Sequence, residues 1–391
     1  MMRGAAGGRN GNGQRKRMSW KRVMGRVAAE VEDRIDRIRR PIDRRLRPNR
    51  PVRIVPYRGY GSPDGVRIRG RVLHGRPPAP ASPDDRWWRN LAAAYRRIES
   101  DEVAHAHVRA HFGGSMADAI ADAEGHFQLV LRTGDAPDDR FWHHARIELL
   151  DPPGQGAEAA VAIPRRPRFG VISDLDDTVL RTDVRNVLRM AREVLFGNAH
   201  TRVPFAGVGA FYRALHDAHG TANPVFYVSS SPWNLHDLLD EFLRLHRIPP
   251  GPMHLRDWGI SRAEVLPTVH HGHKRAAIDQ ILGTYPDLPF ILVGDSGQED
   301  PEIYRDVVHD FPDRILAVYI RSVIPDPVRI GAIQELADEI ATTHSDCELV
   351  LVDDTVAAAR HAAGRGWIDD GAIRDIARDR AVENAAEAAP A

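Results

Sequence analysis

The chain has 391 residues, 42% hydrophobic and 28% charged, which suits two or three domains with full-sized cores. Cys347 is the only cysteine, so no internal disulfide can form, and no apolar run reaches the roughly 18 residues of a transmembrane helix. The basic N-terminus lacks the apolar segment of a secretory signal. We therefore expect a cytoplasmic protein.

Charge is unevenly distributed, although the formal net charge is zero. Residues 1–53 contain 17 Arg or Lys and five Asp or Glu, a local charge of +12 (17 − 5), so the remainder carries −12. A basic arm on an acidic body is typical of proteins that bind an anionic surface, either a membrane or a nucleic acid. The arm contains no recognisable nucleic-acid-binding motif, so a membrane surface is the expected partner.

Residues 1–50 are expected to form a basic arm that contains one amphipathic helix. Over residues 19–46, apolar side chains recur at helical spacings of three and four, with basic residues between them. The apolar stripe comprises Trp20, Val23, Val27, Val31, Ile35 and Ile38. Two interpretations remain open: the helix packs on the protein's own core, or it lies on an anionic membrane surface.

Residues 51–165 are predicted to form a separate, mostly β domain. Residues 66–72 alternate between apolar and polar side chains, residues 126–131 do so in part, and residues 141–150 also favour a strand. Residues 84–100 favour a helix. We expect a small β-sandwich with a packing or docking role, because no catalytic motif lies in this part of the chain.

From residue 168 the pattern changes to apolar runs that alternate with helical segments. This alternation predicts an α/β domain with a parallel sheet, which we place at residues 166–375. The expected strands are 168–174, 225–229, 252–256, 290–294, 315–321 and 348–352, and the expected helices include 232–246, 274–284, 301–310 and 329–341. Residues 376–391 are rich in Ala and Glu, and we expect a flexible tail there.

The most informative stretch is residues 169–178, in which an apolar run ends in Asp174 and Asp176, with Thr178 two residues later. The run predicts a buried strand, and period-two alternation would aim both carboxylates to the same side where the strand ends. Two acids in this position suit a cation site, or a nucleophile paired with a general acid/base. The alternative is an acidic turn without chemistry.

Two further strand ends carry polar side chains. Residues 225–229 end in a serine, residues 290–295 end in an aspartate with Asp300 five residues later, and Lys274 lies between these runs. The order D-x-D-x-T, Ser, Lys and G-D-x-x-x-x-D resembles the four-part signature of the haloacid-dehalogenase-like phosphatases. This resemblance implies a Rossmannoid parallel sheet with its ligand at the carboxyl ends of the strands, and a small cap within residues 179–224.

Longer segments make the resemblance more specific. Ser229–Asn234 (SSSPWN), His254–Trp258 (HLRDW) and Gly294–Tyr304 (GDSGQEDPEIY) are similar to the actin-patch type of phosphatidate phosphatase. The similarity covers about residues 165–325. It implies the hydrolysis of phosphatidate to diacylglycerol and phosphate, with Mg²⁺ as the cofactor.

The resemblance implies a set of catalytic roles. Asp174 is the expected nucleophile, which forms an aspartyl phosphate, and Asp176 is the expected general acid and base. Lys274 would offset negative charge in the transition state, and Ser229 would donate a hydrogen bond to a phosphoryl oxygen. The alternative for Lys274 is an ordinary surface lysine. Asp177 matches the family string, but alternation points its side chain away from the site.

The expected metal ligands are Asp174, Asp295 and the carbonyl of Asp176, because hard oxygen ligands suit Mg²⁺. Asp300 would bind the metal or orient one of its waters. As an alternative, Asp300 caps the helix that starts at Pro301, and both roles are compatible.

The residues expected at the substrate are Thr178, Ser230, Trp233 and Arg256. Thr178 would tie the catalytic loop by a backbone hydrogen bond, and Ser230 is an alternative to Ser229 as the hydroxyl donor. Trp233 and Arg256 would contact the headgroup or the lipid, with ordinary packing as the alternative for each.

The histidines at 270, 271 and 273 suggest a zinc site, but the sequence has no matching Cys or His pair at structural-zinc spacing. We expect instead a loop that positions Lys274.

These features favour a Mg²⁺-dependent phosphatidate phosphatase that binds the membrane peripherally. Two alternatives remain: a phosphatase of the same mechanism that acts on a soluble phosphomonoester or a phosphoprotein, and a membrane-binding adaptor without turnover. The intact acidic motifs and Lys274 argue against the adaptor.

Overall fold

The computed structural model describes residues 51–75, 102–132, 138–175, 206–256, 267–323, 326–343 and 346–388. The helices expected at 19–46 and 84–100 lie outside these residues. The chain forms two compact units, one of Met1–Arg50 with Trp258–Val269 and one of Pro51–Asp257 with His270–Ala391. Of the first unit, the structure describes only residues 267–269, where a helix begins. The following description concerns the second unit.

The N-terminal part of this unit is mostly β, as predicted. Its strands are β1 (Val52–Pro56), β2 (Gly59–Ser62), β3 (Gly65–His74), β4 (His107–Phe112), β5 (Ser115–Ile120), β6 (His126–Arg132), β7 (Trp142–Asp151) and β8 (Ala157–Ala162). They pair in the order β1-β3-β2-β8-β7-β4-β5, and β6 pairs with β3. All pairs are antiparallel except β2 with β8.

The expected sandwich is wrong in one respect, because hydrogen bonds join all eight strands into one sheet. Strands far apart in that sheet nevertheless share a core: Val108 and Ala110 of β4 pack in the same cluster as Leu129 and Leu131 of β6. The sheet therefore bends around a single apolar interior. The alternation along β6 fits this arrangement, since Val130 between the two leucines is exposed.

The C-terminal part is an α/β domain with a six-stranded parallel sheet, in the order β11-β10-β9-β12-β13-β14. Its strands are β9 (Gly170–Asp174), β10 (Val225–Pro232), β11 (Met253–Arg256), β12 (Phe290–Asp295), β13 (Ile315–Arg321) and β14 (Glu348–Val352). Its helices are α4 (Val208–His216), α5 (His236–Leu245), α6 (Pro267–Thr284), α7 (Asp300–Asp310), α8 (Pro327–Thr343), α9 (Thr355–Gly364) and α10 (Asp370–Ala388).

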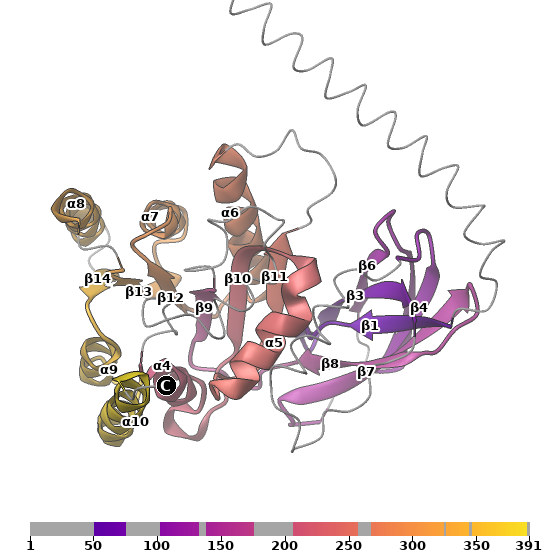
Figure 1. The fold of residues 1–391 in the computed structure, drawn as a ribbon, viewed down its shortest axis with the longest axis horizontal. Coiled ribbons are helices and arrows are strands. Elements are labelled where there is room, and N and C mark those ends of the chain that lie inside the picture. Colours follow the sequence, from indigo (N-terminus) through magenta and orange to yellow (C-terminus); the bar gives the residue numbers. More distant parts are fainter. Residues whose placement is uncertain are drawn as a thin grey trace, which may run out of the picture. The chain divides into compact units, whose positions relative to one another are not determined.

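Helices cover both faces of this sheet. Helices α6, α7 and α8 lie on one side, and α4, α9 and α10 lie on the other (Figure 1). Neighbouring residues of one strand pack into the cores on opposite faces of the sheet, as Val171 and Ile172 of β9 do. Burial on both faces explains why the strands are continuous apolar runs rather than alternating ones.

All six strands expected in this domain are confirmed, within three residues at each end. The helices were predicted less completely, because α4, α9 and α10 were not anticipated. Helix α4 lies within residues 179–224, where a cap was expected, but its Phe211 and Leu215 are buried in the core beside the sheet. Residues 179–205 of the expected cap lie outside the described residues.

The expected flexible tail is also corrected for residues 376–388, which continue helix α10. Ile376 is 1% exposed and packs in the core on the α4 side of the sheet. Farther along the helix, Glu383 accepts a hydrogen bond of 2.6 Å from the Gly207 amide. Among the described residues, no helix is long and apolar enough to cross a membrane.

The two parts of this unit share aromatic contacts. Tyr57, between β1 and β2, stacks on Trp233 with ring centroids 4.6 Å apart and planes 13° apart. Tyr60 of β2 meets the ring of Phe226 edge-on at 5.3 Å. Both tyrosines are at most 6% exposed, so the β region buries its own side chains in the α/β cores.

Replacement of Ile376 by alanine tests whether α10 is part of the core. The substitution leaves a cavity under α10 and should lower the free energy of unfolding by about 2–5 kcal/mol. The control is Val382→Ala on the same helix, where Val382 is 64% exposed and the expected change is within about 0.5 kcal/mol. Equal stability of the two variants in urea denaturation would show that α10 does not pack as described.

Candidate active site

The candidate site lies at the carboxyl ends of the three central strands. Asp174 is the last residue of β9, Ser229 lies near the end of β10, and Asp295 is the last residue of β12. Because β10 and β12 flank β9 in parallel, these three ends share one edge of the sheet. The prediction from sequence is confirmed in this respect.

Lys274 joins the acidic groups at this edge. Its Nζ lies 2.7 Å from Oδ1 of Asp174 and 2.7 Å from Oδ1 of Asp300. The side chains of Lys274 and Asp174 are each 4% exposed, and that of Asp300 is fully buried. The alternative of a surface lysine is therefore wrong. Charges this deeply buried interact strongly, because little water remains to screen them.

Asp295 and Asp300 are held by the turn between β12 and α7. Oδ1 of Asp295 accepts hydrogen bonds from the amides of Gly297 (2.5 Å) and Gln298 (3.2 Å). Oδ2 of Asp300 accepts one from the Asp295 amide at 3.2 Å. Asp300 is the first residue of α7 and Glu299 occupies the N-cap position. The capping alternative for Asp300 is therefore not what the structure shows.

Gly294 permits the close approach of Asp300. A Cβ at position 294 would lie 2.6 Å from Oδ2 and 2.8 Å from Cβ of Asp300, and 2.8 Å from the ring of Tyr304. No ordinary side chain fits at these distances. Steric exclusion of a side chain thus explains why the G-D-x-x-x-x-D motif has glycine at position 294.

The site has an excess of negative charge. Asp174, Asp295 and Asp300 each place a carboxylate oxygen within 4.8 Å of the others, and Lys274 supplies one positive charge against three negative ones. Hard oxygen donors at such spacing can hold a divalent cation. Among the described residues, this is the only cluster of potential metal ligands.

Two buried tyrosines lie beneath the acids, and neither was anticipated from the sequence. The hydroxyl of Tyr212 lies 2.5 Å from Oγ of Ser173, the residue before Asp174. Burial raises the pKa of Tyr212, and the charge of Asp174 raises it further. The hydroxyl of Tyr304 donates to the Val293 carbonyl at 3.0 Å, and burial followed by the charge of Asp300 raises its pKa as well. Both phenols therefore remain neutral supports.

Arg329 of α8 fixes the turn that carries the acids, and it too was missed. Its Nε donates to the Ser296 carbonyl at 2.9 Å, and its Nη2 donates to the Gln298 carbonyl at 2.7 Å. The same guanidinium bonds to the Glu302 carboxylate through two nitrogens. Arg329 is thus a positioning residue for the turn. The local sequence gives no signal for this contact, since about 30 residues separate the partners.

The serines at the end of β10 are all buried. Oγ of Ser229 accepts a hydrogen bond of 2.9 Å from the amide of Ser231. Strand β10 continues to Pro232, and a short 3₁₀ turn precedes α5, which starts at His236. The expected helix start at Pro232 is therefore wrong. Ser230 is 2% exposed and lies on the same strand end.

The remaining expected site residues differ in position. Trp233 is 6% exposed and stacks on Tyr57, and Arg256 is 8% exposed at the end of β11. The histidine segment 270–273 belongs to α6 rather than to a loop. Asp176 and Thr178 lie outside the described residues, so their roles stay predictions.

Comparisons with known proteins bear on the same segment. Residues 169–322 match the family described as phosphatidate phosphatase APP1, catalytic domain. The phosphatidate phosphatase APP1 of Saccharomyces cerevisiae is 38% identical over 154 residues, which are 39% of this chain and 26% of that protein. An uncharacterized Schizosaccharomyces pombe protein is 30% identical over 168 residues, which are 42% of this chain and 27% of that protein. The chain thus matches about a quarter of each relative's length.

The similarity to solved structures gives no further argument about the fold or activity of this chain. A carbohydrate acetylesterase from Xanthomonas citri aligns over 73% of this chain and 72% of its own, but with 11% identity and a TM-score of 0.23. A score this low carries no argument about fold or activity. The resemblance to the actin-patch type of phosphatidate phosphatase, inferred from the sequence, is confirmed by the family match and the yeast relative.

The substitution Gly294→Ala tests the packing of the acidic turn. We expect it to force Asp300 away from the end of β12 and to lower the free energy of unfolding by about 1–3 kcal/mol. The matched control is Gly331→Ala in the exposed middle of α8, where an added Cβ meets no described atom within 4 Å. That control should be neutral or stabilising by up to about 1 kcal/mol. Equal thermal stability of the two variants would contradict the steric argument.

Proposed function

We propose that this protein hydrolyses phosphatidate to diacylglycerol and phosphate. The basis is that residues 169–322 match the family described as phosphatidate phosphatase APP1, catalytic domain. The observation that carries the proposal is the buried cluster at the end of β9. Asp174 and Asp300 each lie 2.7 Å from Lys274, and Asp295 lies beside them. This combination of acids and one lysine suits phosphoryl transfer to a carboxylate.

We further propose that the domain is haloacid-dehalogenase-like. The support is topological: β9, which carries Asp174, occupies an inner position in the order β11-β10-β9-β12-β13-β14. The motif residues follow one another along the chain while their strand ends lie side by side. A doubly covered parallel sheet places its ligand at this edge.

The proposed chemistry proceeds in two displacements. A carboxylate oxygen of Asp174 attacks phosphorus and forms an aspartyl phosphate, while the bond from phosphorus to the diacylglycerol oxygen breaks. Asp176 gives a proton to that leaving oxygen. It then takes a proton from the water that attacks phosphorus, which releases phosphate and restores the Asp174 carboxylate. Lys274 offsets negative charge near Asp174, and Ser229 donates a hydrogen bond to a phosphoryl oxygen.

Asp174, Asp295 and Asp300 would hold a Mg²⁺ ion, together with the Asp176 carbonyl. The fit rests on their carboxylate oxygens lying within 4.8 Å of one another with a single lysine as counter-charge. When bound, the ion supplies positive charge that lets an anionic phosphoryl group approach three carboxylates.

The test compares Asp174→Asn with wild type on mixed micelles of phosphatidate and detergent, with release of phosphate as the measurement. The amide cannot attack phosphorus, so turnover should fall by about 10² to 10⁴ or more. The control is Asp118→Asn, an exposed β5 aspartate that pairs with Arg109 outside the site. It should retain wild-type turnover. Activity of Asp174→Asn within tenfold of wild type would exclude Asp174 as the nucleophile.

The same assay separates the alternatives and tests the cofactor. Excess chelator should abolish turnover, Mg²⁺ should restore it, and Ca²⁺ should inhibit, because Ca²⁺ prefers longer bonds and more ligands. A panel of soluble phosphomonoesters and phosphopeptides is assayed in parallel. Preference of the wild-type protein for a soluble compound would favour a phosphatase that acts on soluble phosphomonoesters or phosphoproteins. No turnover of any substrate at any metal concentration would favour a membrane-binding adaptor without catalytic activity.

We also propose that the basic arm brings the enzyme to anionic membranes. The support is the local charge of +12 over residues 1–53, since each basic residue near an anionic surface contributes about 1 kcal/mol to binding. Deletion of residues 1–48 should weaken sedimentation with phosphatidate-containing vesicles and slow turnover on them. Turnover of a short-chain soluble phosphatidate should stay unchanged, and added salt should mimic the deletion. Equal losses on both substrates would instead indicate a helix packed on the protein's core.

A further inference from the structure

A pocket lies where the β region meets the α/β domain, and its lining includes His273, the residue before Lys274. It has a volume of about 400 Å³, within the range of pockets that bind small molecules. Strands β3 and β6 supply one wall, and the turn after β10, strand β11 and helix α6 supply the other. None of the four acidic-site residues Asp174, Lys274, Asp295 and Asp300 lines it.

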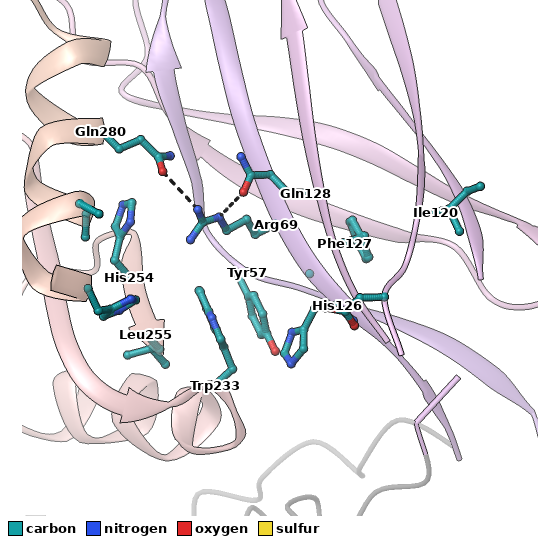
Figure 2. Close-up of a pocket in the computed structure, with 15 residues that line it drawn as sticks. Tyr57, Arg69, Ile120, His126, Phe127, Gln128, Trp233, His254, Leu255 and Gln280 are labelled. Atoms are coloured by element: carbon teal, nitrogen blue, oxygen red, sulfur yellow. Dashed lines mark hydrogen bonds between the residues drawn. The ribbon is translucent and has the colours of Figure 1, made fainter. Parts of the chain in front are cut away.

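Arg69 of β3 lies in the middle of this pocket, held by two neutral amides. Its Nε donates to Oε1 of Gln128 on β6 at 3.1 Å, and its Nη2 donates to Oε1 of Gln280 on α6 at 3.3 Å. Figure 2 shows the guanidinium between these two side chains, above Trp233. Its Cζ lies 5.9 Å from the Trp233 ring centroid. The guanidinium is therefore fixed in position by side chains that leave its charge unchanged.

The positive charge of Arg69 acts on two histidines that line this pocket. Burial lowers the pKa of His254 well below its ordinary value, and the charge of Arg69 lowers it further. On the other wall, burial lowers the pKa of His126 to about 4, with Arg71 and Arg69 contributing in the same direction. Both imidazoles are thus neutral at neutral pH, because burial disfavours their charged forms and the nearby arginine charge adds to this effect.

The carboxylate that lines this pocket, Asp122, is turned to the backbone. Its Oδ1 accepts hydrogen bonds of 2.9 Å from the amides of Glu124 and His126. The aromatic faces of Trp233 and Tyr57 lie on the side away from Gln128 and Gln280 (Figure 2). An occupant would therefore meet a cation with stacked rings beside it. Ile120 and Gln128 are exposed, which gives access from solvent.

We propose that this pocket binds a phosphate monoester group through Arg69, either as a free small molecule or as a lipid headgroup. A guanidinium matches the geometry of phosphate oxygens and forms charge-assisted hydrogen bonds with them. A dianion gains more from the positive charge of Arg69 than a carboxylate with one charge does. The amides of Gln128 and Gln280 add polar contacts, and the rings accommodate the carbon part of the ligand.

The test measures binding of glycerol 3-phosphate and of inorganic phosphate by isothermal titration calorimetry, on the full chain in excess chelator. Chelator separates the two sites, because the three carboxylates of the acidic site repel an anion when no cation is bound there. Wild type should show one saturable site. Arg69→Met should weaken binding about tenfold or more, as expected for the loss of charge-assisted hydrogen bonds of about 1.5–3 kcal/mol.

Matched variants make the result specific. Arg146→Met is the control, since Arg146 lies on β7 with its side chain 74% exposed and should bind like wild type. Gln128→Leu, at an exposed position, removes one support of Arg69 and should weaken binding severalfold, which covers the case that Arg69→Met does not fold. Asp295→Asn should leave binding in chelator intact, so failure of the proposed catalytic function and failure of this site remain distinguishable.

Vesicles of phosphatidate in phosphatidylcholine, again in chelator, distinguish the two sources of the phosphate group. A defect of Arg69→Met relative to Arg146→Met on vesicles alone would identify the lipid headgroup as the ligand. A defect with the soluble compounds would identify a free phosphate monoester. The proposal is overturned if wild type shows no saturable binding of either soluble anion and if Arg69→Met and Arg146→Met bind the vesicles equally.

Discussion

The buried contact of Lys274 with Asp174 and Asp300 is the constraint on which the site depends. All three side chains are at most 4% exposed, and an ion removed from water costs several kcal/mol unless a partner lies within hydrogen-bond distance. The contact joins the end of β9, the second turn of α6 and the first residue of α7. Displacement of any of these elements would leave a buried charge without compensation, so the contact selects one arrangement of the three. The turn that follows β12 is held separately by Arg329, which keeps Asp295 beside the network.

The same network is incomplete in charge. Three carboxylates face one ammonium group, so a further cation is favoured and an anionic phosphoryl group is disfavoured without one. Burial and the charges of the nearby acids raise the pKa of Tyr212 and of Tyr304, so both phenols stay neutral and add no charge to the network. We propose that a bound ion supplies the balancing positive charge. A substrate with a dianionic phosphate increases the need for a bound cation. The proposed activity therefore depends on the proposed cofactor.

Local sequence patterns predicted the sheet and the positions of its polar strand ends, because strands buried on both faces leave uninterrupted apolar runs. They predicted the ends of helices less well. Helix α6 begins at Pro267 rather than near Lys274, since its polar histidine segment has no apolar periodicity. Contacts between distant segments could not be predicted from local sequence patterns. Neither the stacking of Tyr57 on Trp233 nor the hydrogen bonds of Arg329 to the acidic turn has a local signature. Trp233 was selected for its place in a family motif, and its neighbours became visible only in three dimensions.

Helix α6 explains how the two polar sites can lie close together and stay separate. Lys274 faces the acids, whereas His273, Ala277 and Gln280, at spacings of four and three, share another face that lines the pocket. Gln280 also donates to the hydroxyl of Tyr60 at 2.9 Å and accepts from Arg69, and both partners belong to the β region. The β region therefore contacts the helix that carries Lys274 through hydrogen bonds, and it contacts the turn after β10 through stacked rings. A domain attached only for docking would not need to place an arginine and two tyrosines against that helix and its neighbours. The β region is thus better understood as a structural part of the α/β domain, and its removal would expose the pocket wall formed by Trp233 and α6.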